Sequence, residues 1–178
     1  RTSGKTIVKA LTSAKSLGDR ATNSSMGAAV LSRGLAAGLF TATSTVESAF
    51  ELGVELAELT HGDPAAGAAT GALTALTSLL ASGVGRMEAC ETVAQLLARE
   101  DTSGAVRATY NSAVAMGSSD APIAYDLPRM GRTHLAPGCL AFAVYCLLKA
   151  QTFTDGIILS VNHDGDSDTV AAIAGGLL

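Results

Sequence analysis

Tryptophan is absent from this sequence, and aromatic residues make up only 4% of it. Sheet-based folds such as β-sandwiches usually depend on aromatic and β-branched residues in alternation, so the scarcity of aromatics argues against that class. Alanine and the 19 glycines are abundant instead. Small side chains of this kind favour helices that pack closely against one another.

Runs of lysine or arginine are also missing, and the formal net charge is −4 with an isoelectric point near 5.3. A nucleic-acid-binding protein would be expected to carry a basic face, so we do not expect a nucleic-acid partner. The three cysteines, Cys90, Cys139 and Cys146, form no Cys-x-x-Cys pair. Their odd number and scattered positions fit buried thiols in a reducing compartment, and with no visible signal peptide they predict a cytoplasmic protein.

Charge is missing altogether from residues 64–85. A membrane-spanning helix needs about 20 predominantly apolar residues, whereas glycine, threonine and serine interrupt this run and leucines are few. We therefore expect a buried core helix and no membrane partner. A length of 178 residues without a composition shift predicts a single domain over residues 1–178.

Apolar residues recur at helical spacing along most of the chain, which predicts an all-α fold. Ser44 and Glu47 have the spacing of a capping box, and Asp63 followed by Pro64 is a strong helix start. Thr152 or Thr154 can begin a later helix. Besides these, helices are expected at about residues 7–17, 30–39, 46–57, 64–83, 86–100, 103–117 and 138–150.

Three aspartates, Asp164, Asp166 and Asp168, alternate directly before an uncharged apolar segment. One aspartate at a helix N-terminus is favourable by a few tenths to about 1 kcal/mol. Three within five residues repel one another, and a bound cation would relieve that repulsion. Oxygen ligands suit Mg²⁺, Mn²⁺ or Ca²⁺, and a solvated loop that caps the last helix is the alternative.

Two familiar motifs fit less well. An EF-hand starting at Asp164 would place Thr169 where glycine is required and Gly175 where glutamate is required. The segment "SGKT" (Ser3–Thr6) resembles the end of a nucleotide-binding P-loop. The full P-loop needs another glycine five residues earlier, as well as a preceding strand, and the sequence predicts no strands.

Four segments together resemble the ADP-ribosylglycohydrolase family. "NHDGDSDTVAAIAGGLL" (162–178) resembles its C-terminal signature, in which Gly-Asp-x-Asp-Thr opens a helix of small residues. "ATNSSMGAAVLSRGLAAGLF" (21–40) is similar to its Asn-Ser loop entering a helix, and "AELTHGDPAAGAATGAL" (57–73) to its Thr-His segment. "GRTHLAPGCLAFAVYCLL" (131–148) is similar to its Gly-rich loop with Ala-Pro before an apolar helix.

The resemblance implies an all-α hydrolase that uses two Mg²⁺ or Mn²⁺ ions. Its substrate would be an ADP-ribosylated protein, often modified on arginine, or an ADP-ribosyl small molecule, cleaved at the glycosidic bond. Asp166, Asp168 and Thr169 fall on the family's C-terminal metal-ligand positions. Asp168 would also act catalytically, by stabilising an oxocarbenium-like charge.

The same resemblance implies a substrate-binding loop before a helix, where free N–H groups favour a diphosphate. Its residues are Asn23, Ser24, Ser25, Met26 and Gly27. His61 would donate to a phosphate, or else contact the last carbonyls of its own helix. His134 would stack on the adenosine end, or else be merely exposed.

The sequence also departs from the family pattern. Gly138 stands where the family has glutamate after Ala-Pro, and the family's N-terminal Thr-Asp-Asp motif does not occur. We therefore expect these residues to correspond to the C-terminal part of the family domain, with half of a two-metal site. A catalytically inactive member that binds ADP-ribose, or has a structural role, is the alternative.

Overall fold

The computed structural model describes residues 4–121 and 132–178. Within these ranges the regular elements are helices, joined by one isolated β-bridge between Gly27 and Leu135. The all-α prediction is confirmed. The elements are α1 Lys5–Ser13, η1 Ala28–Val30, α2 Ser32–Phe40, α3 Val46–Glu58, α4 Pro64–Ala81, α5 Arg86–Glu100, α6 Ala105–Gly117, α8 Ala136–Lys149, α9 Phe153–Val161 and α10 Ser167–Leu177.

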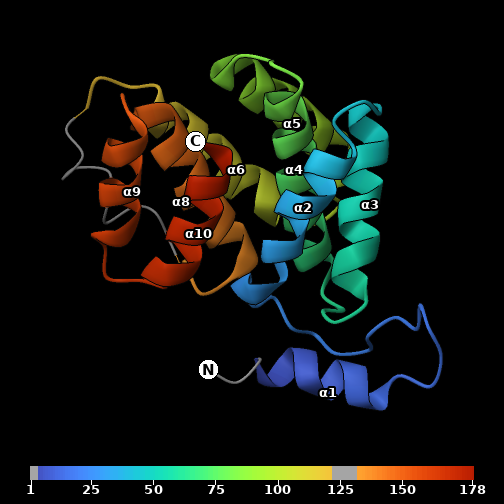
Figure 1. Cartoon of the computed structure of the whole chain (residues 1–178). Coiled ribbons are helices and arrows are strands. Elements are labelled where there is room, and N and C mark those ends of the chain that lie inside the picture. The colour runs from blue at the N-terminus through green and yellow to red at the C-terminus, as the bar shows by residue number, and fades with distance from the viewer. Residues whose placement is uncertain (1–3, 122–131) are drawn as a thin grey trace.

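Two helices form the centre of the bundle. α4 packs against α2, α3 and α5, and α8 packs against α6, α9 and α10 (Figure 1). The two central helices also contact each other, so that Leu76 of α4 and Leu140 of α8 are fully buried in one core. α1 lies apart from this core, below the bundle in Figure 1.

α4 is long and apolar enough to cross a membrane by length and composition, but 78% of it is buried inside the protein. This burial is typical of a core helix. Its glycines bring neighbouring helices very close: a Cβ on Gly71 would lie 2.8 Å from the carbonyl oxygen of Phe50 in α3. Close approach of this kind explains why the sequence holds many small side chains and few aromatic ones.

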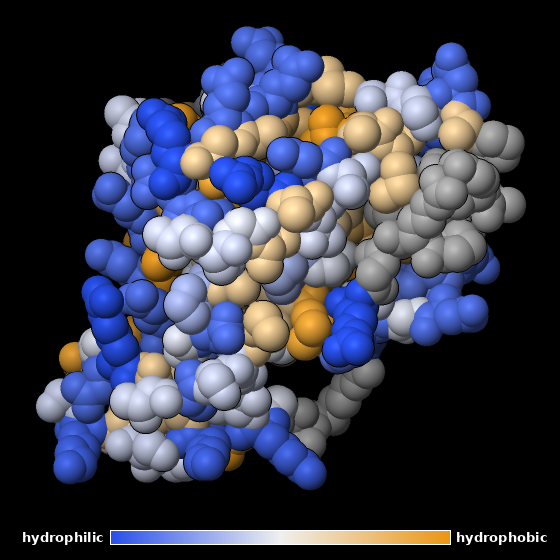
Figure 2. All heavy atoms as spheres, turned by 180° about the vertical axis from the view of Figure 1, so that it is seen from behind, coloured by the Kyte–Doolittle hydropathy of each residue, from blue (hydrophilic) through white to orange (hydrophobic). Residues whose placement is uncertain are grey.

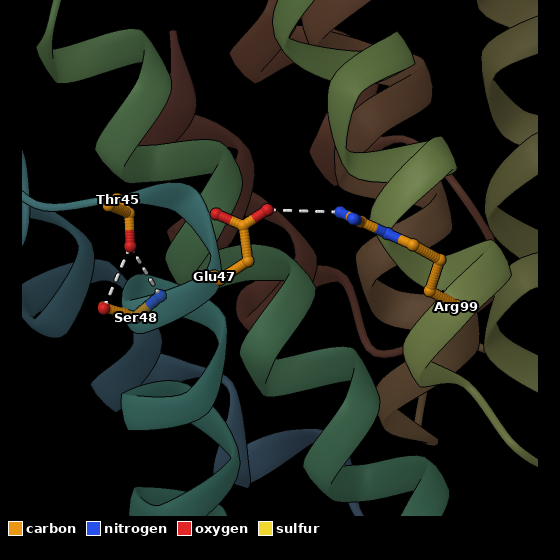
Figure 3. Close-up of polar contacts among 4 residues, drawn as sticks. All are labelled: Thr45, Glu47, Ser48 and Arg99. Carbon is orange, nitrogen blue, oxygen red and sulfur yellow. Dashed lines mark hydrogen bonds and ion pairs between the residues drawn. The ribbon is translucent and has the colours of Figure 1, made fainter.

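The predicted capping box at the start of α3 is wrong. The N-cap is Thr45, whose hydroxyl accepts the Ser48 N–H at 3.2 Å, and Ser44 lies one residue outside the helix (Figure 3). Glu47 turns away from the helix start and pairs with Arg99 of α5 at 3.2 Å. A long-range ion pair has therefore replaced the local hydrogen bond that the spacing predicted.

Other predicted helix starts are confirmed. Asp63 accepts the Ala65 N–H at 2.9 Å with Pro64 in the first turn, and Thr152 forms a capping box with Asp155. α8 begins two residues earlier than predicted, at Ala136. Proline suits the first turn of a helix, where its missing N–H is not needed, and Pro137 occupies that turn.

The first helix is shorter than predicted, because it ends at Ser13 instead of continuing to residue 17. No residue of α1 is buried. Short helices without tertiary packing are marginal, so nothing extends this one. The chain turns after it, and the Asp19 carboxylate accepts the N–H groups of Lys15 and Ser16 at 2.8 and 2.9 Å.

Candidate functional site

Loops from distant parts of the sequence meet at the N-terminal ends of their helices. The loop before η1 is joined to the loop before α8 by two backbone hydrogen bonds, one on each side of the Gly27–Leu135 bridge. The Ala28 N–H donates to the His134 carbonyl at 3.0 Å, and the Ala136 N–H donates to the Met26 carbonyl at 2.8 Å. The predicted substrate loop and the "RTHLAP" segment (132–137) are therefore neighbours.

Asn23 joins this loop to the segment before α4. Its side-chain amide donates to the Thr60 carbonyl at 2.9 Å, and its Oδ1 accepts the N–H groups of Ser25 at 2.9 Å and Gly62 at 3.4 Å. Asn23 therefore stabilises the loop, because its side-chain amide forms hydrogen bonds with backbone groups of residues 25, 60 and 62.

Thr133 joins the aspartate segment to the same place. Its buried hydroxyl accepts the Asp166 N–H at 2.8 Å, across 33 residues of sequence. Residues 23–27, 60–63, 132–135 and 163–166 therefore form one four-loop cluster. Sequence reasoning did not single out Thr133, because a threonine carries no sign of a partner that only the folded chain brings close.

His61 lies inside this cluster and is only 1% exposed. Its Nδ1 is 2.8 Å from the Thr60 hydroxyl, and its Nε2 lies 3.6 Å from where a Cβ on Gly27 would be. Burial lowers the pKa of His61, and the positive charge of Arg33 lowers the pKa further. The imidazole is thus a neutral ring packed behind the substrate loop.

Arg33 was not predicted as part of this region. Its guanidinium donates to the Leu56 carbonyl at 2.8 Å, which holds α2 against α3. Burial lowers the pKa of its guanidinium below the ordinary value. The residue is close enough to His61 to influence the imidazole, and only the packing of α2 on α3 places it there.

The predicted metal ligands share the start of α10. Asp166 is the N-cap and is partly buried, Asp168 is exposed in the first turn, and Asp168 Oδ1 accepts the Thr169 N–H at 2.9 Å. No group of three His, Cys, Asp or Glu side chains that could hold an ion occurs in the part of the chain that the structure describes. Among the described residues, the two carboxylates therefore lie together at the start of α10 without a third side chain of these types to complete such a group.

Neighbouring groups limit the chemistry available at this end of α10. Burial raises the pKa of the Cys139 thiol to about 12, and the negative charge of Asp166 adds to the effect. The thiol is therefore neutral and is not a nucleophile.

His163 stacks on Phe142 with ring centroids 4.3 Å apart, and its Nδ1 accepts the Gly165 N–H at 3.0 Å.

The remaining predicted residues lie at the surface of the cluster. Ser24 is exposed, whereas Ser25 and Met26 are partly buried. With Thr6, Lys9 and Asn23, the two serines line a cavity of about 290 Å³. The His134 side chain is exposed, and only its carbonyl takes part in the loop contacts.

The P-loop alternative finds no support. Lys5 begins α1 and Gly4 precedes it, but residues 4–121 and 132–178 contain no strand that could belong to the parallel sheet of a P-loop fold. Ser3 lies outside the described residues.

The fold and cluster define a class: a helical domain in which a Ser-rich loop and an aspartate-capped helix meet at one end of the bundle. A family model described as ADP-ribosylglycohydrolase matches residues 1–178, the whole chain. This chain therefore belongs to the ADP-ribosylglycohydrolase family. A search of curated proteins found no match.

Proposed function

We propose that this member of a family of ADP-ribose glycohydrolases is a metal-dependent enzyme that releases ADP-ribose from a modified arginine side chain of a protein. The observation that carries the proposal is the four-loop cluster. The Met26–Ala136 and Asp166–Thr133 hydrogen bonds bring a loop suited to phosphates beside two carboxylates suited to a cation.

Asp166, Asp168 and the Thr169 hydroxyl would hold a divalent cation in this proposal. The donor set fits, because Mg²⁺ is commonly bound through one or two carboxylates and keeps several waters. When bound, such a cation orients ribose hydroxyls and lowers the pKa of a water molecule. The resemblance to the family implies two ions, and in this proposal the start of α10 would supply carboxylates for part of that set.

Asp168 would have a second role during cleavage. Glycosidic bonds break through a state with positive charge on the sugar ring, and a nearby carboxylate stabilises that charge. Asp168 is exposed in the first turn of α10, where its Oδ1 accepts the Thr169 N–H at 2.9 Å. Its position would allow it to face both a cation and the reacting carbon.

The Ser24 and Ser25 hydroxyls would contact the diphosphate in the cavity that they line. His61 would act as a positioning residue, because it is buried behind Gly27 and supports the loop from inside. The exposed ring of His134 would be free to stack on the adenine.

The test compares Asp168→Asn with Asp164→Asn. Both changes remove one charge from the same loop, and asparagine keeps an oxygen that can accept the Thr169 N–H. We expect Asp168→Asn to lower the Mg²⁺-dependent release of ADP-ribose from an arginine-ADP-ribosylated peptide by about a hundredfold. Asp164→Asn should remain close to the unmodified chain. Full activity of Asp168→Asn, or activity that persists in a chelator, would contradict the proposal.

A binding function without turnover is the second candidate. It is favoured by the finding that no three potential metal ligands of the His, Cys, Asp and Glu types meet within the described residues. Calorimetry with free ADP-ribose would then show binding in the absence of any metal-dependent release.

A further inference from the structure

A larger cavity, of about 490 Å³, lies between α1 and the segment that follows it. Cavities of about 300–1,000 Å³ are the usual size for ligand sites. Its polar lining residues are Lys9, Ser13, Lys15, Asp19, Arg20, Thr22 and Asn23. The proposed hydrolase chemistry assigns no function to this basic cavity.

Two of the positively charged side chains in the basic cavity form no ion pair with the described residues. Lys9 and Lys15 are exposed, and no ion pair engages either of them in the described part of the chain. Arg20 pairs with Glu58 at 2.9 Å, and one oxygen of Asp19 is held by backbone N–H groups. The cavity therefore presents two ammonium groups that a ligand could neutralise.

The charge of this region is opposite to that of the rest of the chain. Residues 5–20 contain four lysines and arginines and one aspartate, whereas residues 21–178 contain seven lysines and arginines against fifteen acidic residues. Figure 2 shows a predominantly hydrophilic lower edge, where α1 and the following segment lie. An acidic ligand would be repelled by most of the surface and attracted to this edge.

The basic cavity is next to the four-loop cluster. Lys9 and Asn23 line both the basic cavity and the 290 Å³ cavity of Ser24 and Ser25. The Thr6 and Ser25 hydroxyls are 3.4 Å apart, which links α1 to the substrate loop. A ligand seated at the loop could therefore continue past Lys9 into the basic cavity.

We propose that the basic cavity binds an acidic segment of the ADP-ribosylated acceptor protein. Aspartate and glutamate side chains near the modified residue would pair with Lys9 and Lys15. The position of the ADP-ribosyl group in this proposal rests on the proposed hydrolase function, but the binding of an acidic peptide does not require turnover. The cavity would thus select among acceptor proteins by the charge of their surroundings.

The experiment measures binding of a fluorescent oligoglutamate peptide by polarisation at low salt, with an oligoglutamine peptide as the ligand control. The variants are Lys15→Ala and Arg107→Ala. Both remove one positive charge from an exposed side chain, but Arg107 lies outside residues 5–20 and does not line the basic cavity. Binding of free ADP-ribose is measured for each variant as well.

We expect the Lys15→Ala variant to bind oligoglutamate about threefold more weakly, with unchanged affinity for ADP-ribose, because Lys15 lines the basic cavity and not the cavity of Ser24 and Ser25. The control variant should bind both ligands like the unmodified chain. Equal peptide affinity in all three proteins, or an equal loss in both variants, would overturn the proposal. A loss of ADP-ribose affinity with unchanged peptide binding would also overturn it, because the cavity would then belong to the nucleotide site.

A turnover assay separates this proposal from the hydrolase function. With arginine-ADP-ribosylated peptides, the Lys15→Ala variant should raise KM about threefold for a peptide with acidic flanks and leave kcat unchanged. A peptide with neutral flanks should show no change. Absence of turnover in every protein would contradict the hydrolase function alone, since the polarisation result stands without it.

Discussion

At the scale of one residue, the packing around Gly138 leaves no room for a side chain, which accounts for the glycine at this position. A Cβ at this position would lie 2.8 Å from the carbonyl carbon of Arg132 and closer still to its oxygen. A glutamate here, which the resemblance to the family implies, would therefore require the loop of residues 132–135 to move. Since that loop holds Asp166 through Thr133, the glycine and the geometry of the cluster depend on each other.

This contact predicts the effect of Gly138→Ala. The added methyl group collides with backbone, so we expect the free energy of unfolding to fall by about 1–3 kcal/mol, measured in urea. Gly67→Ala is the matched control, because Gly67 also lies near the start of a helix but its Cβ would meet only Val54 Cγ1 at 3.4 Å. A loss in the control as large as in Gly138→Ala would refute this explanation.

His61 predicts a pH dependence of stability. Its pKa in the folded chain is below the ordinary value of 6.5, so below that pH the unfolded chain binds a proton that the folded chain resists. The stabilisation from the neutral ring is complete above pH 6.5 and is lost as the pH falls toward the folded-state pKa. In His61→Gln, the free energy of unfolding should therefore decline less between pH 8 and 5.5 than in the unmodified chain.

Urea midpoints at several pH values measure this difference, and His134→Gln provides the control. The His134 side chain is exposed, so His134→Gln removes a histidine without disturbing the buried part of the four-loop cluster. Parallel profiles for His61→Gln and the unmodified chain would show that His61 is not responsible.

At the scale of the element, α1 differs from every helix of the bundle. It contributes no residue to the core, and Val8 and Leu11 are 47% and 62% exposed. α4 and α8, in contrast, are buried along most of their length. The stability of the fold therefore resides in the bundle, whereas α1 shapes the two cavities beside the substrate loop.

Substitutions in the two elements should therefore have unequal effects. Leu11→Ala in α1 should shift Tm by no more than about 2 °C, because surface changes rarely exceed about 0.5 kcal/mol. Leu76→Ala in α4 removes a fully buried side chain and should lower Tm by about 5 °C or more. Calorimetry of both variants tests the difference, and an equal loss would mean that α1 is part of the cooperative core.

Several elements were predictable because their signals are local. α5 begins and ends at the predicted residues, and Asp63 and Thr152 cap the predicted helices. α3 shows the limit of such reasoning. Ser44 and Thr45 are adjacent and either could cap the helix, but the N-cap is Thr45. Glu47, the expected partner of Ser44, pairs with Arg99 on α5 instead.

At the scale of the whole molecule, the family assignment explains the order of the loops, and the structure explains their proximity. Each of the four loops precedes a helix, so bringing these helix ends together places the predicted substrate and metal residues at one end of the bundle. The metal ligands, the substrate contacts and the linkage cleaved remain predictions.

The all-α class, most helix positions and the family resemblance were determined by the sequence itself, because periodicity, caps and short motifs depend on neighbouring residues. The tertiary structure alone decided that Thr133 holds Asp166, that His61 is buried behind Gly27, and that Lys9 faces two cavities. These contacts join residues far apart in the chain. Their formation depends on how the helices pack, which no local pattern encodes.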